Sequence, residues 1–220
     1  MIKRIQFTES FVSAEAPTVI LFHGFGANMH DLAGLQDLLT PENKKVNWIF
    51  PNGPYSVPIG PGWTGQAWWP LQLSSLPSDW SDVTPNTLPE LLPALQDFFK
   101  SLNRPWNKII LGGFSQGAML ATDLYLHAPE TPLGLISFSG SLIRKSVWSE
   151  KIKQRQNQKI FLSHGEQDAV LPIRGTQMLI ELMRKNNIST DFVSFRGAHE
   201  IPVNVCERAQ KYIAERTKDL

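Results

Sequence analysis

Apolar positions along the chain follow two patterns. Short runs of consecutive apolar, often β-branched residues recur through the sequence, and such runs are typical of strands buried on both faces. Between them lie stretches whose apolar positions recur every three or four residues, as in an amphipathic helix. The runs predict strands at 18–22, 46–50, 108–111, 133–140, 159–165 and 190–195, with an alternating edge strand at 2–7. The stretches predict helices at 31–39, 91–102, 118–126 and 173–184, and a closing helix from about 202.

Strands that alternate with helices favour an α/β fold, a mostly parallel sheet with helices on both faces. No repeat or linker divides the pattern, and 220 residues suit one domain with a sizeable core, so we expect a single domain over 1–220. In such sheets ligands bind beyond the carboxyl ends of the strands. The loops that follow the strands are therefore expected to share one rim.

The stretch at about 51–85 departs from this alternation because prolines interrupt it repeatedly. An irregular segment longer than about 12–15 residues in a compact domain is either functional or disordered. Its tryptophans argue against disorder, since a solvated linker has no use for them. We expect an ordered excursion that walls or covers an apolar pocket; the alternative is a satellite core under neighbouring loops. The tryptophans are Trp63, Trp68, Trp69 and Trp80.

Composition narrows the class of protein. Hydrophobic residues make up 42% and charged residues 19%, as in a globular protein, and the formal net charge of +1 gives no electrostatic case for binding nucleic acid or an anionic membrane. No apolar run has the length of a membrane span, and residues 1–9 turn polar too soon for a signal peptide. The single cysteine, Cys206, excludes an intrachain disulfide, which suits a reducing cytoplasm. It shares a helical spacing with Ala209 and Ile213, which predicts a buried apolar filler.

A G-x-S-x-G pentapeptide at 113–117 lies between the strand expected at 108–111 and the helix expected at 118–126. In that context it predicts a nucleophile elbow, a sharp strand-to-helix turn that exposes the hydroxyl of Ser115 above the sheet. Strand and helix would then lie so close that a Cβ at either glycine collides, with the serine in an unfavourable backbone conformation. Because such pentapeptides also arise by chance, the rest of a triad has to appear in the right order.

A serine hydroxyl needs a base to take its proton, and α/β-hydrolases place the histidine after the serine and the acid. His23 and His30 precede the serine, and His127 lies near the end of the helix that leaves the elbow. His164 has no well-placed acid between itself and the serine. His199 remains as the predicted base, in a glycine-containing loop after the last strand.

The predicted acid is Asp168, which lies just past the strand at 159–165. Its carboxylate would accept a hydrogen bond from His199, fix the tautomer and stabilise the imidazolium. Glu166 is the fallback, whereas Asp191 lies inside the last strand.

Acyl transfer also requires donors for the developing oxyanion. The residue after the nucleophile supplies one, the backbone N–H of Gln116, and the loop after an early strand supplies the other. In that loop we favour the N–H of Phe25, with Gly24 or Gly26 as alternatives. His23 is then interpreted as a residue that braces the loop.

Taken together, four segments resemble the carboxylesterase/phospholipase family of small α/β-hydrolases, which includes acyl-protein thioesterases. They are His23-Gly24-Phe25-Gly26, Gly113-Phe114-Ser115-Gln116-Gly117, His164-Gly165-Glu166-Gln167-Asp168 with Val170 and Pro172, and Gly197-Ala198-His199. They span nearly the whole chain in the family's order. The resemblance implies an α/β-hydrolase fold and hydrolysis of carboxylic or thioester bonds through a serine acyl-enzyme, without metal or cofactor. By matching position it makes Ser115, Asp168 and His199 the triad, and Phe25 and Gln116 the oxyanion donors.

The chain departs from the family's pattern in two places. Ala118 stands where a second glycine is common, and 67–70 reads Ala-Trp-Trp-Pro where a tryptophan, an aromatic residue and an aspartate are usual. These departures affect the expected substrate more than the chemistry, because the 51–85 excursion is where family members shape the acyl pocket. We place Trp68, Trp69 and Leu171 at that pocket.

The expected function is hydrolysis of short- to medium-chain acyl esters or thioesters, with a lysophospholipid or an acylated protein as further substrates. Two alternatives stay open: the same triad acting on a peptide, lactone or peracid, and a non-catalytic binding protein on this fold. No His-Glu-x-x-His motif, cysteine pair or carboxylate cluster indicates a metal site. We expect a cytoplasmic monomer or weak homodimer whose activity falls on acidification, since free imidazole titrates near pH 6.5.

Overall fold

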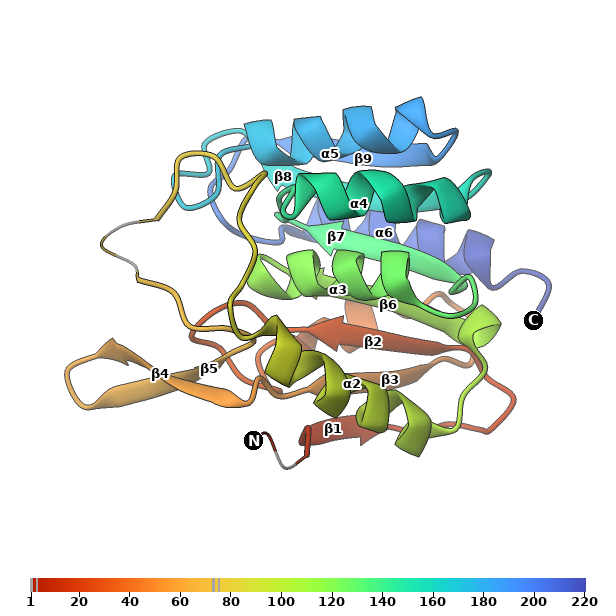
Figure 1. Cartoon of the computed structure of the whole chain (residues 1–220). Coiled ribbons are helices and arrows are strands. Elements are labelled where there is room, and N and C mark those ends of the chain that lie inside the picture. Colours follow the sequence, from red (N-terminus) through yellow and green to blue (C-terminus); the bar gives the residue numbers. More distant parts are fainter. Residues whose placement is uncertain (1, 3, 73, 75) are drawn as a thin grey trace.

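A computed structural model of the chain describes residues 2, 4–72, 74 and 76–220. Its centre is a seven-stranded sheet in the order β1-β3-β2-β6-β7-β8-β9, in which β1 runs antiparallel to β3 and every other pair is parallel (Figure 1). Two further strands, β4 and β5, pair with each other as an antiparallel hairpin. The strands are β1 (Phe7–Ser10), β2 (Thr18–Phe22), β3 (Asn47–Pro51), β4 (Tyr55–Gly60), β5 (Trp63–Ala67), β6 (Ile109–Phe114), β7 (Gly134–Phe138), β8 (Lys159–Gly165) and β9 (Ser189–Phe195).

Helices cover both faces of this sheet, as the alternation of strands and helices predicts. On one face lie α2 to α5, and on the other lie α1 and α6 (Figure 1). The expected α/β class, a mostly parallel sheet with helices on both faces, is therefore confirmed. The helices are α1 (Gln36–Leu39), α2 (Leu88–Leu102), α3 (Gln116–His127), α4 (Lys145–Lys151), α5 (Arg174–Lys185) and α6 (Val203–Arg216), with 3-10 turns η1 (Ala33–Leu35), η3 (Trp106–Lys108) and η4 (Ile152–Arg155).

The two faces of the sheet bury separate apolar cores. Ile109 and Leu111 of β6 pack into the core beneath α2 to α5, whereas Ile110 between them packs into the core beneath α1 and α6. Successive side chains of a strand point to opposite faces, so a central strand needs apolar residues at every position. This is why the strands appear in the sequence as continuous apolar runs.

The expectation that 51–85 is irregular is wrong for 55–67, which forms the β4–β5 hairpin. Pro58 lies within β4, where the register shifts between Pro58 and Gly60. A proline lacks the N–H of a ladder bond, but an edge strand has one row of groups that need no partner. The hairpin extends away from the main sheet (Figure 1) and leaves Trp63 exposed at its end. Residues 73 and 75 of the expected excursion lie outside the described residues.

Two other expected elements differ from the structure. The edge strand expected at 2–7 begins only at Phe7 among the described residues, although the carbonyl oxygen of Gln6 still accepts the N–H of Asn52 at 2.8 Å. Ile5 is buried in the core ahead of the strand. The helix expected at 31–39 is reduced to η1 followed by one turn, α1. Gly34 disfavours a helix within this stretch and Pro41 prevents its continuation.

The remaining elements lie where the pattern places them, within a few residues at each end. One helix, α4, was not expected. Trp148 is its only fully buried residue, so its sequence shows no helical repeat of apolar positions. Among the described residues, none of the helices combines the length and the apolar character that crossing a bilayer requires.

Candidate active site

Ser115 lies at the turn from β6 into α3, as the elbow pattern predicts. Its φ and ψ are 56° and −119°, a conformation that residues other than glycine rarely adopt. The backbone N–H of Ser115 donates to the carbonyl oxygen of Phe138 at the end of β7, at 2.9 Å, and so ties the turn to the neighbouring strand. The side chain is largely buried and lines a cavity beyond the strand ends.

The glycines of the elbow are required by close packing. A Cβ on Gly113 would lie 2.4 Å from the carbonyl carbon of Gly117, and one on Gly117 would lie 2.0 Å from the carbonyl oxygen of Phe22. Contacts this short do not occur, so an alanine at either position would displace backbone. The second contact also joins the elbow to the end of β2, where the loop that contains Phe25 begins.

Asp168 lies in the loop after β8, residues 166–172, which we call the acid loop. Its Oδ1 accepts hydrogen bonds from the backbone N–H groups of Val170 at 2.9 Å and Leu171 at 2.8 Å. These bonds fix the carboxylate by the loop's own backbone and direct Oδ2 toward His199. The carboxylate oxygens are inaccessible to solvent in this arrangement.

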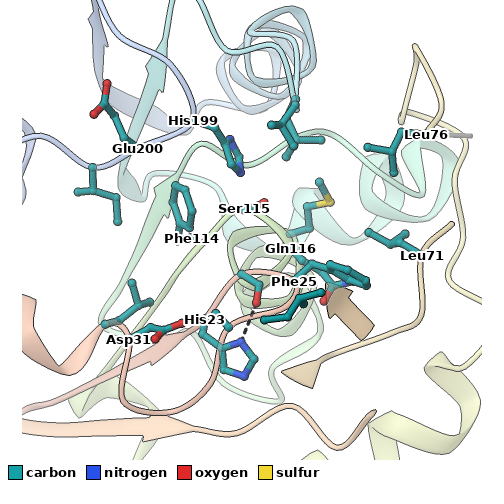
Figure 2. A pocket seen from close by; sticks show the side chains of 18 of the residues that line it. His23, Phe25, Asp31, Leu71, Leu76, Phe114, Ser115, Gln116, His199 and Glu200 are labelled. Atoms are coloured by element: carbon teal, nitrogen blue, oxygen red, sulfur yellow. Dashed lines mark hydrogen bonds between the residues drawn. The ribbon is translucent and has the colours of Figure 1, made fainter. Parts of the chain in front are cut away.

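His199 lies in the loop after β9 and contacts this carboxylate. Its Nδ1 is 2.6 Å from Oδ2 of Asp168, so Nδ1 carries a proton, and in the neutral ring Nε2 is then the nitrogen with the lone pair. The ring also packs against that of Phe114, at 4.6 Å between centroids. Figure 2 shows the imidazole directed toward Ser115, and both residues line the same cavity. The structure thus brings together the three residues that the sequence predicts as a triad.

His164, which sequence order excludes as a base, contacts the same acid. Its Nε2 is 3.3 Å from Oδ2 of Asp168. Burial raises the pKa of the Asp168 carboxyl, but hydrogen bonds from His164, His199 and the Leu171 N–H outweigh that effect and hold the pKa well below its usual range. The carboxylate is therefore ionised at neutral pH. Sequence reasoning missed this second histidine, although its spacing of four residues from Asp168 was a visible signal.

The predicted oxyanion donors, Phe25 and Gln116, line the cavity together with Ser115. Gln116 is the first residue of α3, and N–H groups in the first turn of a helix have no partner within it. Such groups are therefore available to a negative charge that develops beside the serine.

The loop with Phe25 is held from one side by β5. The N–H of Gly26 donates to the carbonyl oxygen of Gln66, and the N–H of Gln66 donates to the carbonyl oxygen of Ala27, each at 2.8 Å. A Cβ on Gly65 would lie 1.8 Å from the carbonyl oxygen of Gly26, so only glycine allows this approach. The hairpin that the sequence failed to indicate therefore positions the loop with Phe25.

His23 braces the same loop from the inside. Its Nδ1 donates to the carbonyl oxygen of Gly24 at 2.7 Å, a bond marked in Figure 2, and its Nε2 accepts the N–H of Gly53 at 2.9 Å. An imidazole that accepts at Nε2 is neutral, and burial lowers the pKa of His23, which favours that form. This agrees with the interpretation of His23 as a bracing residue.

The prediction that Trp68 and Trp69 line the acyl pocket is wrong. Both are fully buried, and neither is among the residues that line the cavity. The indole N–H of Trp68 donates to the carbonyl oxygen of His23 at 2.9 Å. The side-chain amide of Gln116 bridges the two, because its Oε1 accepts the N–H of Trp68 at 2.9 Å and its Nε2 donates to the carbonyl oxygen of Trp69 at 2.8 Å. The tryptophans thus tie the elbow to the loop with Phe25.

The cavity beside Ser115 has a volume of about 550 Å³ and a mostly apolar wall. The predicted pocket residue Leu171 lines it. The excursion does line the cavity, but with Leu71, Leu76 and Trp80 instead of Trp68 and Trp69. In Figure 2 Leu71 and Leu76 lie on the opposite side of Ser115 from Asp31 and Glu200. Further apolar lining comes from Leu32, Leu35, Ile59, Met119, Val170 and Ile201.

Comparison with known proteins gives a consistent result. The family model described as Phospholipase/Carboxylesterase matches residues 4–217. The acyl-protein thioesterase 1 homolog 1 of Dictyostelium discoideum is 25% identical over 207 residues, which cover 90% of this chain and 90% of that protein. The acyl-protein thioesterase 1 of Kluyveromyces lactis is 27% identical over 210 residues, which cover 91% of this chain and 92% of that protein.

Solved structures share the whole fold. The crystal structure of esterase PE8 superposes with a TM-score of 0.80 at 25% identity, covering 96% of this chain and 99% of that one. The Bacillus cereus carboxylesterase superposes with a TM-score of 0.72 and covers 97% of this chain and 95% of its own; at 15% identity this likeness concerns the fold alone.

Proposed function

Because this chain belongs to the phospholipase/carboxylesterase family, we propose that it is a serine hydrolase that cleaves carboxylic esters and thioesters through an acyl-enzyme on Ser115. The observation that carries the proposal is the 2.6 Å contact between His199 Nδ1 and Asp168 Oδ2, with His199 and Ser115 on one cavity. The family's description as phospholipases and carboxylesterases and the acyl-protein thioesterases among the relatives support the same class of reaction.

In the first half of the reaction Oγ of Ser115 attacks the acyl carbon while its proton passes to Nε2 of His199. Asp168 stabilises the imidazolium that forms, because its ionised carboxylate accepts a hydrogen bond from Nδ1–H, which keeps its proton. The tetrahedral intermediate then expels the alcohol or thiol, which takes the proton from Nε2 as the bond from the acyl carbon to oxygen or sulfur breaks. The acyl group remains on Ser115 as an ester.

In the second half a water molecule attacks the acyl-enzyme and gives its proton to Nε2 of His199. Collapse of the second intermediate releases the carboxylic acid and returns the proton to Oγ of Ser115. In both halves the oxyanion accepts hydrogen bonds from the backbone N–H groups of Phe25 and Gln116. Loss of one such donor costs about 2.7–4 kcal/mol of transition-state stabilisation in a serine hydrolase.

The substrate proposed is a short- to medium-chain acyl ester or thioester. Aliphatic residues dominate the wall of the 550 Å³ cavity, which suits a hydrocarbon chain better than a polar one. Leu71, Leu76 and Met119 would contact this chain. We further propose that the enzyme acts in the cytoplasm as a monomer or weak homodimer; its single cysteine, Cys206, suits a reducing compartment.

The test replaces Ser115 by alanine and uses Ser146→Ala, an exposed serine on α4, as the matched control. We expect Ser115→Ala to lose both hydrolysis of p-nitrophenyl esters and labelling by a fluorophosphonate, with an unchanged circular dichroism spectrum, while the control keeps both. A panel of aryl esters and acyl thioesters of graded length then ranks the substrates. Undiminished turnover by Ser115→Ala would contradict the proposal.

A further inference from the structure

His164 is a fully buried histidine that the proposed reaction does not use. It lies near the end of β8, and its ring is enclosed by three oxygen atoms. Nδ1 is 2.8 Å from Oγ1 of Thr176, and Nε2 is 2.7 Å from the carbonyl oxygen of Leu171. Nε2 is also 3.3 Å from Oδ2 of Asp168. These contacts join the end of β8, the acid loop and the first turn of α5.

The protons available to these contacts can be counted. Thr176 has one hydroxyl proton, and it donates this proton to the carbonyl oxygen of Gly140 at 2.7 Å. Oγ1 of Thr176 is therefore an acceptor toward Nδ1 of His164. The carbonyl oxygen of Leu171 has no proton at all, so Nε2 has to donate as well. Both ring nitrogens face acceptors, and a neutral imidazole has only one N–H.

Either neutral tautomer of His164 leaves an unfavourable contact. If the lone pair is on Nε2, that nitrogen faces the Leu171 carbonyl oxygen and Oδ2 of Asp168, and neither has a proton to donate. If the lone pair is on Nδ1, the Thr176 hydroxyl must turn toward it and leave the Gly140 carbonyl unpaired. Buried polar groups without a partner are strongly destabilising. A buried positive charge is tolerated where it is paired and hydrogen-bonded, and the ionised carboxylate of Asp168 supplies that pair.

The charged groups around the ring support this state. Among the described residues, Asp168 supplies the one carboxylate within 4 Å of the ring. His199 contacts the same carboxylate from the loop after β9. Glu166 of the acid loop and Arg174 of α5 are exposed, and Ser194 is the register neighbour on β9. Exposed charges are screened by solvent, so Asp168 dominates the electrostatics of the buried ring.

We propose that His164 is held as an imidazolium and acts as a positioning residue for Asp168. It fixes the Asp168 carboxylate in place, and its positive charge weakens the attraction of that carboxylate for a proton on His199. Three N–H···O contacts tie the acid loop to β8 and α5 and so hold Oδ2 in place. The positive charge also offsets part of the negative charge that His199 faces. His199 therefore remains unprotonated, and available as a base, down to a lower pH than beside Asp168 alone.

The protonation state is tested by nitrogen NMR on protein labelled with ¹⁵N-histidine, with His164→Gln used to assign the signals. At about pH 8, where free imidazole is neutral, we expect both ring nitrogens of His164 to give the chemical shifts of protonated nitrogens. His23 is the internal control, because its Nε2 accepts a backbone N–H and must give the shift of an unprotonated nitrogen. One unprotonated nitrogen in His164 would overturn the proposal.

The kinetic consequence rests on the proposed function and is tested by the pH dependence of kcat/KM. In His164→Gln the amide N–H still reaches toward Asp168 and Leu171, but the charge is gone. We expect the acid limb of the profile to move to higher pH by about one unit, the lower end of the effect of a neighbouring charge. Thr176→Val removes the acceptor of Nδ1 and should move the limb in the same direction, whereas Thr176→Ser keeps the hydroxyl and should not.

An unchanged acid limb in folded His164→Gln and Thr176→Val would overturn the tuning role. A merely structural role predicts lower stability in these variants with the limb in its original place. Failure of the proposed function would be recognised separately, since it leaves Ser115 without fluorophosphonate labelling, whereas the NMR measurement on His164 needs no activity.

Discussion

The side-chain amide of Gln116 gives the sharpest test of how the site is held. It makes two buried hydrogen bonds, from the N–H of Trp68 at 2.9 Å and to the carbonyl oxygen of Trp69 at 2.8 Å. Leucine at this position fills a similar volume and can form neither bond. The backbone N–H of the same residue, which is the proposed oxyanion donor, is retained. Gln116→Leu therefore removes only the support of the donor.

The expected size of the effect follows from these two bonds. The substitution leaves one buried donor and one buried acceptor unpaired, each costing about 1–3 kcal/mol, so we expect the free energy of unfolding to fall by about 2–6 kcal/mol. Complete loss of an oxyanion donor reduces kcat by about 10²–10³-fold. A displaced donor should lose part of that effect, and we expect kcat to fall by about tenfold with KM changed little, because the contact is made mainly in the transition state.

Urea unfolding and steady-state hydrolysis of p-nitrophenyl butyrate measure the two quantities. Gln177→Leu, an exposed glutamine on α5, is the matched control and should change the free energy of unfolding by less than about 0.5 kcal/mol. If Gln116→Leu is as stable as the control and keeps its kcat, the bridge to Trp68 and Trp69 has no part in positioning the donor.

Three further predictions concern other parts of the molecule. Gly65→Ala should lower both thermal stability and kcat, because its Cβ would lie 1.8 Å from the carbonyl oxygen of Gly26; Gly60→Ala in the same hairpin meets nothing within 4 Å and should change neither. Asp168 has a lowered pKa, so its stabilisation is complete above the unfolded pKa of about 3.9 and is lost as the pH falls further. The urea midpoint should drop as the pH is lowered below about 4, and less steeply in Asp168→Asn. Burial raises the pKa of the Cys206 thiol, so a thiol reagent should label it only on unfolding; rapid labelling of the native protein would contradict this.

The parallel core was predictable because its signal is local. Each central strand is buried on both faces and therefore appears as a continuous apolar run, as at 159–165, which coincides with β8. The order of serine, acid and histidine is likewise a property of the chain. Once Ser115, Asp168 and His199 each follow a strand, the parallel sheet itself brings them to one rim.

The hairpin at 55–67 was not predictable on the same grounds. Most positions of its two strands are exposed or half-buried, so no apolar alternation marks them, and Pro58 gives the signal of an irregular segment. The role of Trp68 was equally hidden, because a tryptophan on a cavity wall and a tryptophan with a buried N–H look alike in sequence. The indole of Trp68 points to the carbonyl oxygen of His23, 45 positions earlier in the chain, and no local pattern encodes that contact.

These hidden contacts change how the departure at 67–70 is understood. If these residues lined the acyl pocket, the departure would change which substrate is preferred and would not affect the catalytic chemistry. The Trp68 and Trp69 backbones instead bond the side chain of Gln116, and the same hairpin bonds the loop around Gly26. Both proposed oxyanion donors are thus supported by one segment, 65–69. Substitutions there should therefore reduce kcat for every acyl length in parallel, whereas changes at Leu71 or Leu76, which line the cavity, should alter the preference among lengths.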